Sequence, residues 1–459
     1  MGKIEIIGLG KSGIAAAKLL QKVGEEVTIY DADNSGKFNT LQQKLAKENI
    51  TVELGQNIPL NPNNLPDLIV VSPGVPWDIP VLVKAREKGI PTIGEMELAW
   101  RYLQNCPWVA ITGTNGKTTT TALIEAMFTN GGIKTSACGN IGYAACELAL
   151  QSLENQPEWV VAEVSSYQIE SSSELSPKIG IWTTFTPDHL ARHKTLVNYH
   201  NIKASLLRRS YSKIFNGDDP YLRNLGLTES WENVYWTSVK GKEFLLGDES
   251  KGVFLQDSWI VAFGELICPI SLFKMVGLHN QQNLLMATAA AKLAGVSKSA
   301  IAHTITTFTG VNHRLELITT INGVDYVNDS KATNYDAAEV GLESVSSPVI
   351  LIAGGEAKEG NDLPWINKIK EKCACVLLIG ESADFFASRL DSENYHQYEK
   401  VGNMAKAVSR AGEIAQQTEA RVVLLSPACA SFDQYNSFEE RGDDFKQLTL
   451  SLAVHGTKS

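Results

Sequence analysis

Short runs of apolar residues alternate with longer amphipathic segments along most of the chain. This alternation predicts strands joined by helices, in α/β units with parallel sheets. The predicted strands fall into three series. They cover residues 4–7, 27–30, 68–71 and 92–94, then 108–111, 159–162 and 179–186, then 324–327, 349–352, 376–379 and 422–425. We therefore expect three α/β domains.

The spacing of the series places domain boundaries near residues 94 and 311, giving domains at 1–94, 95–310 and 311–459. Inside the middle domain, the polar and aromatic stretch 211–275 predicts additional β structure. A helix is predicted to follow it at about 280–293. A chain of 459 residues is long enough for two to four domains of about 100–200 residues each.

The composition favours a globular protein that binds neither nucleic acid nor a membrane. Hydrophobic residues make up 44 %, enough for several cores, and 41 basic against 51 acidic residues leave a net charge of -10. This charge argues against nucleic acid as a partner. The start of the chain reads as a strand, and no apolar run reaches the roughly 20 residues that span a bilayer. The seven scattered cysteines predict buried thiols. We expect a cytoplasmic protein without a membrane partner.

A first glycine-rich turn, Gly8-Leu9-Gly10-Lys11-Ser12-Gly13, lies between the first predicted strand and a helix. Glycines there allow a pyrophosphate to approach the N-terminus of the helix. Asp31 ends the next strand, where an acid that binds ribose belongs. The turn on its own suggests NAD, but it does not specify the nucleotide. Ser72-Pro73-Gly74 forms either a second turn facing the ligand or an ordinary tight turn.

A second glycine-rich turn, Thr112–Thr119 with the sequence TGTNGKTT, also joins a strand to a helix. It ends in GKT as a P-loop does, although the full P-loop spacing is lacking. Backbone N–H groups of such a loop cradle phosphates, Lys117 neutralises them, and Thr118 can reach Mg²⁺. Two nucleotide turns in separate domains fit neither a dehydrogenase nor a GTPase switch. They suggest an enzyme that uses ATP to activate a nucleotide-linked substrate.

Candidate metal ligands follow the strands beside this loop. Glu163 ends the strand at 159–162, and a carboxylate at that edge of the sheet is well placed for Mg²⁺. Asp188 and His189 lie at the end of the next strand, and Lys203 follows in a predicted helix. By itself each of these residues has an ordinary structural explanation, and together they suggest catalysis.

The combination of motifs resembles the Mur ligases of peptidoglycan synthesis. It comprises Gly113–Thr118, Glu163–Ser166, Asp188-His189 with Lys203, His279-Asn280 with Asn283, His313-Arg314, Asn328–Asn334, Ser426–Tyr435 and Phe438–Gly442. The last two segments resemble those of the family branch that adds D-glutamate. The resemblance implies an N-terminal Rossmann-like domain, a central P-loop-containing α/β ATPase domain and a C-terminal Rossmann-like domain.

The resemblance also implies roles for individual residues. UDP-N-acetylmuramoyl-L-alanine would be bound by Ser12, Asp31, Ser72, Gly74 and Asn140. ATP would be bound by Gly113, Thr114, Asn115, Gly116, Lys117, Thr118, Thr119, Asn280, Asn283, Arg314 and Asp329. D-glutamate would be bound by Thr333, Lys358, Ser431 and Phe438. Two magnesium ions would be held by Thr118, Glu163, His189 and Lys203, and catalysis would involve Lys117, His189, Lys203 and Lys331.

A lysine among metal ligands is a chemical problem, because an ammonium has no lone pair to offer. Reaction with CO₂ would turn Lys203 into a carbamate, an oxygen ligand of the kind Mg²⁺ prefers, and the matching lysine of the family is carbamylated. The chain departs from the family at Ala191, where an acid is usual, and in the loose loop 354–360 around Lys358.

The implied reaction joins D-glutamate to the substrate carboxylate through an acyl phosphate, with His189 as a candidate base, in a protein expected to be a monomer. Three alternatives stay open. They are a sister Mur ligase or folylpolyglutamate synthase that adds another amino acid, an NAD-dependent oxidoreductase, and a nucleotide-gated binding protein without turnover. The C-terminal segments argue against the first, the second glycine turn against the second, and the set Glu163, His189 and Lys203 against the third.

Overall fold

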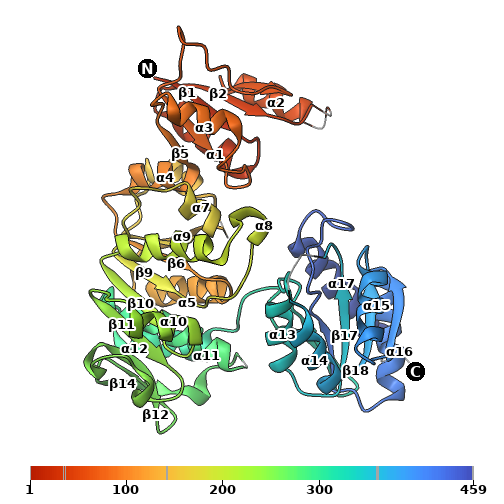
Figure 1. The fold of residues 1–459 in the computed structure, drawn as a ribbon. Coiled ribbons are helices and arrows are strands. Elements are labelled where there is room, and N and C mark those ends of the chain that lie inside the picture. The colour runs from red at the N-terminus through yellow and green to blue at the C-terminus, as the bar shows by residue number, and fades with distance from the viewer. Residues whose placement is uncertain are drawn as a thin grey trace. The chain divides into compact units, whose positions relative to one another are not determined.

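The computed structural model describes residues 2–34, 36, 38–140, 143–275, 277–357 and 361–456, with residues 454–456 described by their backbone only. The chain forms two compact units. One comprises Met1–Leu272 with Gln282–Thr306, and the other comprises Phe273–Gln281 with Thr307–Ser459 (Figure 1). In the part of the chain described, no helix is long and apolar enough to span a bilayer.

The first unit begins with a parallel sheet in the order β3-β2-β1-β4-β5. Its elements are β1 (Lys3–Ile7), α1 (Lys11–Lys22), β2 (Glu26–Asp31), α2 (Asn39–Lys47), β3 (Thr51–Leu54), β4 (Leu68–Val71), α3 (Pro80–Glu87) and β5 (Thr92–Gly94). The strand order reverses between β1 and β4, so the turn after β1 lies at a switch point, where α/β sheets bind ligands.

A second sheet of the same unit has the order β14-β13-β12-β11-β10-β9-β6-β8-β7. Its strands are β6 (Trp108–Thr112), β7 (Thr135–Gly139), β8 (Trp159–Glu163), β9 (Ile179–Trp182), β10 (Ser212–Asn216), β11 (Val234–Ser238), β12 (Gly252–Gln256), β13 (Trp259–Ala262) and β14 (Glu265–Pro269). The pairings are parallel from β7 to β12, and β12, β13 and β14 pair antiparallel. Every residue of β6 is buried.

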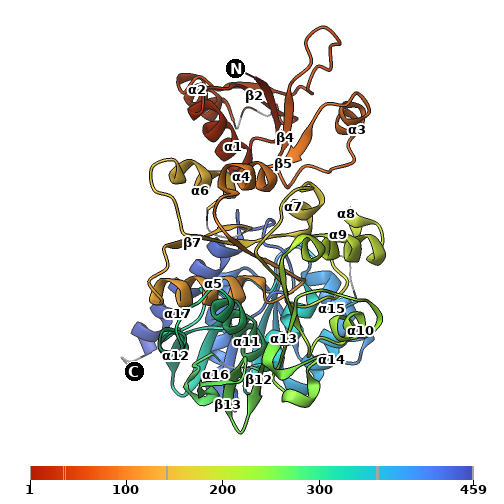
Figure 2. The same ribbon diagram turned by 90° about the vertical axis from the view of Figure 1, so that its left-hand side faces the viewer.

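The helices of this part are α4 (Glu95–Leu103), α5 (Lys117–Asn130), α6 (Ala145–Ser152), α7 (Ser166–Glu170), α8 (Leu190–His193), α9 (Leu196–Arg209), α10 (Pro220–Thr228), α11 (Leu278–Leu293) and α12 (Lys298–Thr307), with short 3₁₀ turns at Lys242–Phe244, Glu249–Lys251 and Ile270–Leu272. Figure 2 shows α6 beside α4, and α1 also packs on α6.

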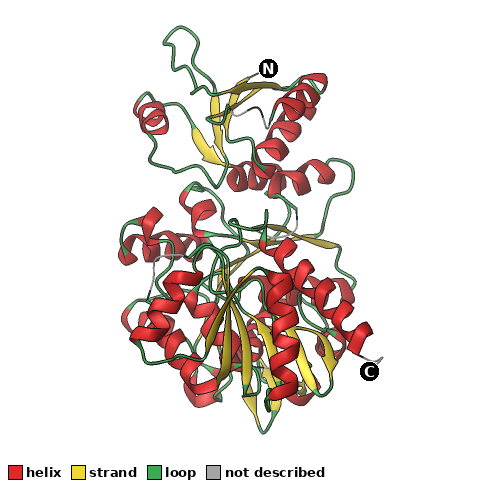
Figure 3. Ribbon diagram, turned by 90° about the vertical axis from the view of Figure 1, so that its right-hand side faces the viewer, coloured by secondary structure: helices red, strands yellow, loops and turns green. Residues whose placement is uncertain are grey.

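The second unit contains a sheet in the order β15-β16-β20-β17-β18-β19, parallel except for β15. Its elements are β15 (Glu316–Ile321), β16 (Val324–Asn328), α13 (Tyr335–Glu343), β17 (Val349–Gly354), α14 (Leu363–Lys372), β18 (Cys373–Ile379), α15 (Ala383–Ser392), β19 (Tyr398–Gly402), α16 (Met404–Gln417), β20 (Val422–Leu425) and α17 (Phe438–Gly456). Successive β17 residues alternate between two cores, with α13–α15 on one face and α16–α17 on the other. Figure 3 shows helices on both sides of the strands.

The structure departs from the sequence-based elements in two ways. Four strands that the apolar pattern did not indicate, β3, β7, β15 and β19, lie at sheet edges. The strand expected at 179–186 was too long, because β9 ends at Trp182. The next residue, Thr183, donates its N–H to the carbonyl of Thr112 at the start of the second glycine turn.

Candidate active site

The second glycine turn joins the buried strand β6 to helix α5. Gly113 has φ +150° and Gly116 has φ +82°, values that favour glycine. A Cβ on Gly113 would lie 1.9 Å from Oγ1 of Thr183. Gly116 is the N-cap of α5, and no side chain in the described chain caps that helix end. The first N–H groups of α5 therefore point into the loop, as in an anion-binding helix terminus.

Thr183 and Thr184, which the sequence did not single out, hold this loop from the strand beside it. Thr184 accepts the Thr114 N–H on its carbonyl and the Asn115 N–H on Oγ1, both at 2.9 Å. The hydroxyl of Thr183 donates to the carbonyl of Thr112 at 3.2 Å. The amides of Thr114 and Asn115 are thus used within the protein, and the amides from Gly116 to Thr119 are the candidates for a phosphate cradle.

Two lysine amines share one carbonyl beneath the loop. Nζ of Lys117 lies 2.9 Å from the Gly113 oxygen and 2.6 Å from that of Thr114. Nζ of Lys203, on α9, lies 2.8 Å from the same Gly113 oxygen and 3.3 Å from Oγ1 of Thr112. Lys203 is 1 % exposed, and burial, helped by the nearby charge of Lys117, holds its pKa well below the ordinary value.

Glu163 lies at the carboxyl end of β8, next to β6 in the sheet. Its Oε2 accepts from the Thr118 hydroxyl and its Oε1 from the Asn140 side chain, both at 2.8 Å. The Asn140 N–H also donates to the Glu163 carbonyl. A carboxylate and a hydroxyl beside a phosphate cradle are hard oxygen donors, so these residues fit Mg²⁺.

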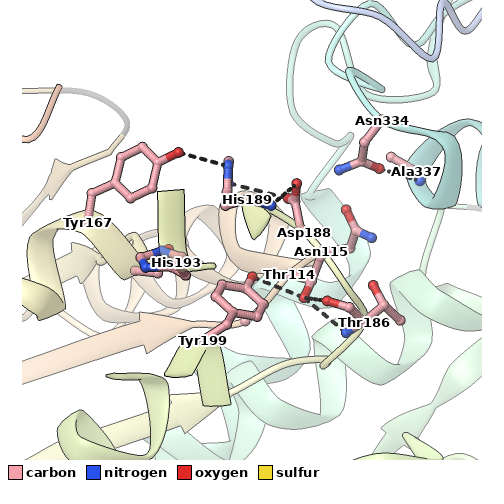
Figure 4. A network of polar contacts seen from close by, with 12 residues as sticks. Thr114, Asn115, Tyr167, Thr186, Asp188, His189, His193, Tyr199, Asn334 and Ala337 are labelled. Carbon is pink, nitrogen blue, oxygen red and sulfur yellow. Dashed lines mark hydrogen bonds and ion pairs between the residues drawn. The ribbon is translucent and has the colours of Figure 1, made fainter. Parts of the chain in front are cut away.

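Asp188 and His189 lie in the connection that follows β9. His189 has φ +56°, an uncommon conformation for a residue with a side chain. Its N–H donates to Oδ1 of Asp188 at 2.8 Å, and its Nε2 lies 3.3 Å from Oδ2. Figure 4 shows the Tyr167 phenol pointing toward this imidazole, with the hydroxyl 3.1 Å from Nδ1.

The phosphate loop and this connection are also linked through side chains. Oγ1 of Thr114 lies 3.3 Å from the hydroxyl of Tyr199, donates to the Thr186 carbonyl at 3.0 Å and accepts the Thr186 N–H at 3.1 Å (Figure 4). Tyr199 belongs to α9, the helix that carries Lys203. The loop, the His189 segment and α9 therefore form one bonded group.

The first glycine turn is held from two strands. Asp31 accepts the Leu9 N–H at 2.7 Å, and Ser72 donates to the Gly8 carbonyl at 3.0 Å. A cavity of about 630 Å³ opens beside the turn. Its lining includes Gly8, Asp31 and Gly74, together with Asn57. Ser12 is half-buried in the first turn of α1. Asn140 differs from these residues, because it follows β7 and is bonded to Glu163.

In the second unit, three sets of residues follow adjacent strands. Residues 329–334 follow β16, residues 426–435 follow β20, and Gly355 follows β17. Nζ of Lys331 lies 4.9 Å from the centre of the Phe438 ring. Ser431 is 2 % exposed, Thr333 is half-buried, and Lys358 lies outside the described residues.

Arg441, which carried no role in the sequence analysis, ties two of these segments together. Its guanidinium donates to Ser330 and to the carbonyls of Cys429 and Ala430, at 2.8–3.1 Å. Burial lowers its pKa to about 10. The sequence indicated Arg441 only through its place within the family-like segment Phe438–Gly442.

Of the remaining residues expected at ATP, Asn280, Asn283 and Asp329 are buried and Arg314 is half-buried. Asn283 accepts from Thr120 at 3.4 Å and lies against Gly116, and Asn280 is 0 % exposed on the same helix, α11. In the second unit, burial raises the pKa of Asp329 to about 7, opposed by the charge of Arg314 and the hydroxyl of Ser426.

Comparison with known proteins gives the family. The sequence matches the descriptions "Mur ligase MurD-like, N-terminal domain" over residues 2–94, "Mur ligase middle domain" over 111–291 and "Mur ligase, glutamate ligase domain" over 313–429. A UDP-N-acetylmuramoylalanine–D-glutamate ligase from Gloeothece citriformis is 66 % identical over 98 % of this chain and 100 % of its own length. The chain belongs to the Mur ligase family.

Other Mur ligases extend the similarity. Proteins of the same name from Microcystis aeruginosa and a Synechocystis species are 64 % and 60 % identical, over 98 % and 97 % of this chain and 100 % and 99 % of their own lengths. The solved UDP-N-acetylmuramate-alanine ligase of Thermotoga maritima matches with a TM-score of 0.61 at 18 % identity, over 98 % of this chain and 100 % of that one. The likeness to the Thermotoga maritima structure confirms the three-part α/β fold of a Mur ligase.

Proposed function

We propose that this Mur ligase uses ATP to join D-glutamate to UDP-N-acetylmuramoyl-L-alanine, releasing ADP and phosphate, in the cytoplasmic synthesis of peptidoglycan precursors. The observation that carries the proposal is identity of 60–66 % over almost the full length to ligases named for this reaction. The phosphate cradle at α5, with Glu163 beside it, supplies the chemical elements that the reaction requires.

The reaction has two steps. A carboxylate oxygen of the UDP-substrate attacks the γ-phosphorus of ATP, forming an acyl phosphate as the bond to ADP breaks. The amine of D-glutamate then attacks the acyl carbon, loses a proton, and expels phosphate as the C–N bond forms. The first step brings two anions together, so positive charge and correct positioning carry most of the catalysis.

In the first step, the N–H groups from Gly116 to Thr119 bind phosphate oxygens. Lys117, whose amine now lies on the carbonyls of its own loop, balances charge on the transferred phosphoryl group. His189 is the candidate to accept the proton of the amine. Lys331 serves the phosphates from the second unit.

Thr118 and Glu163 would hold Mg²⁺, which when bound offsets negative charge on the phosphates. We propose two ions, with His189 and Lys203 completing the ligand set. Lys203 enters that set as a carbamate. Burial and the lowered pKa favour the neutral form of its amine, which is the form that reacts with CO₂. The competing explanation, an ammonium that anchors the loop through the Gly113 carbonyl, is separated from this one by a test described below.

We assign the substrates to the three sheets, with domains at 1–94, 95–310 and 311–459. The UDP-substrate occupies the cavity beside Asp31, with Ser12, Ser72 and Gly74, and reaches Asn140. ATP lies on residues 113–119 with Asn280, Asn283, Arg314 and Asp329. D-glutamate contacts Thr333, Lys358, Ser431 and Phe438. We further propose a monomer that binds neither nucleic acid nor a membrane.

A phosphate-release assay tests the function. The enzyme is given ATP, Mg²⁺ and UDP-N-acetylmuramoyl-L-alanine, with D-glutamate, L-glutamate, L-alanine, a diamino acid or no amino acid. We expect release to depend on D-glutamate and on the UDP-substrate together, with a product whose mass equals that of the ligated pair. Equal turnover with L-glutamate or a diamino acid would assign the chain to a sister ligase.

A further inference from the structure

Tyr167 lies on a short helix whose start is firmly fixed. Helix α7 begins directly after the Glu163 segment, and its N-cap is a reciprocal pair between Ser165 and Gln168. The Gln168 N–H donates to Oγ of Ser165 at 3.3 Å, and the Ser165 N–H donates to Oε1 of Gln168 at 2.9 Å. Such a capping box holds the first turn of a helix in place.

The ring of Tyr167 is held on three sides. Its centre lies 5.0 Å from that of His189 and 5.4 Å from that of His193, and the Arg192 guanidinium carbon lies 4.8 Å from it. Arg192 itself donates to Glu170 on α7 at 2.8 Å. These contacts leave the phenol little freedom, so the position of its hydroxyl is set by α7 and α8.

The hydroxyl of Tyr167 lies 3.1 Å from Nδ1 of His189, and Nε2 of the same ring lies 3.3 Å from Oδ2 of Asp188. A carboxylate oxygen only accepts, whereas a hydroxyl can donate or accept. The phenol and Asp188 together restrict the rotation of the ring.

We propose that Tyr167 is a positioning residue for the ligation reaction, and that it acts by holding Nδ1 of His189 and thereby the orientation of the imidazole ring. The inference rests on the proposed function for its role in catalysis. Because a hydroxyl both donates and accepts, Tyr167 can hold Nδ1 in either tautomer. An imidazole that serves as a base or as a metal ligand requires such a partner at its second nitrogen.

The first test is spectroscopic and uses no substrate or metal. Long-range ¹H–¹⁵N spectra of the ¹⁵N-histidine-labelled protein report which ring nitrogen of each of the eight histidines is protonated. His189→Gln identifies the His189 signal. We expect the Nδ1 shift of His189 to change in Tyr167→Phe, because this nitrogen loses its hydrogen-bond partner, while the signals of histidines far from Tyr167 stay as in the wild type. An unchanged Nδ1 shift would overturn the proposal.

The second test is kinetic. Tyr167→Phe keeps the ring contacts and removes the hydroxyl alone, so kcat should fall about tenfold while the KM for the UDP-substrate stays within about twofold. Tyr211→Phe, which removes an exposed hydroxyl of the same unit, is the control and should behave as wild type. An unchanged His189 signal or an unchanged kcat in Tyr167→Phe overturns the role. A wild type that fails to ligate D-glutamate would instead overturn the proposed function, with the spectroscopic result unaffected.

Discussion

Arg441 binds Ser330 twice, with Nε 3.0 Å from the hydroxyl oxygen and Nη2 2.8 Å from the carbonyl oxygen. The same hydroxyl donates to the Phe438 carbonyl at 2.8 Å. The segment after β16 and the start of α17 are thus held by one buried cation. Because Lys331 and Phe438 are their neighbours, this contact shapes the proposed D-glutamate site.

Replacing Arg441 by alanine should destabilise the second unit by about 3 kcal/mol, since several buried carbonyls lose their donor. Thermal unfolding followed by calorimetry measures this effect, and the KM for D-glutamate should rise. Arg410→Ala is the control, because that guanidinium makes its ion pairs at the surface and should cost less than about 1 kcal/mol. If the two substitutions lowered the free energy of unfolding equally, Arg441 would contribute no more to stability than a surface arginine.

Glu163→Gln tests the magnesium site. The amide keeps the shape of the side chain but loses the charge that draws the cation, so phosphate release should fall by about a hundredfold or more. Glu154→Gln, an exposed substitution in the same unit, should have no effect. Normal release by Glu163→Gln at low Mg²⁺ concentration would place the ion elsewhere.

The Lys203 carbamate predicts rescue by a small carboxylate. Lys203→Ala should lose most activity, and acetate should restore part of it by occupying the vacated space, whereas Lys203→Arg should not respond. Isotope-labelled CO₂ should add a carbamate signal that disappears in Lys203→Ala. Lys213→Ala, which removes another buried lysine, is the control and should give neither acetate rescue nor loss of the carbamate signal. Full activity of Lys203→Ala, or of wild type in CO₂-free buffer, would leave only the anchoring role.

Asp31→Ala should loosen the first glycine turn, because the Leu9 N–H loses its acceptor. Loss of one such bond, roughly 1.4 kcal/mol, corresponds to about a tenfold increase in the KM for the UDP-substrate. The KM for ATP should not change. Asp67→Ala, an exposed acid before β4, is the control. Tight binding of NAD by wild type would contradict the assignment of this turn.

Glu95, at the start of α4, predicts how stability depends on pH. Burial raises its pKa from the ordinary 4.5 to about 7, although the Cys146 N–H donates to it at 2.6 Å. The folded state therefore holds a proton that the unfolded state releases near pH 4.5. This contribution is complete below pH 4.5 and is lost as the pH rises to about 7.

Glu95→Gln should remove that loss, on the order of 3 kcal/mol. Compared with wild type, its melting temperature should decline less between pH 5 and pH 8, as scans in steps of about half a unit would show. Glu147→Gln, an exposed acid on the neighbouring helix α6, should follow the wild-type curve. A parallel decline in Glu95→Gln would show that Glu95 keeps its ordinary pKa.

The apolar pattern located the central strands because both faces of a central parallel strand are buried. Residues 108–112, for example, are buried throughout. Edge strands lack this pattern. In β3 only Val52 is buried, and β19 reads Tyr-Glu-Lys-Val-Gly with no fully buried residue. Their positions follow from pairing with a neighbour, which the sequence pattern does not contain.

Part of the candidate site could likewise be predicted from local sequence patterns. Glycine turns and residues at strand ends are local features, and the sequence placed Gly113–Thr118 and Glu163 at adjacent strand ends. Contacts between distant segments were not visible. Thr184 bonding to the amides of Thr114 and Asn115, and Tyr167 reaching His189, depend on how the loops fold back. Threonine and tyrosine are too common in such loops to signal these partners.

The carbonyl shared by Lys117 and Lys203 has a consequence for communication within the enzyme. A positive charge on one amine disfavours a second positive charge beside it, so the contacts of Lys117 and Lys203 with the Gly113 carbonyl are coupled. A change in the chemical state of Lys203 alters how strongly Lys117 is held to its own loop, and therefore how readily that amine turns toward an incoming phosphate. Under the proposed carbamylation of Lys203, the freedom of the Lys117 amine therefore depends on the chemical state of a side chain on α9.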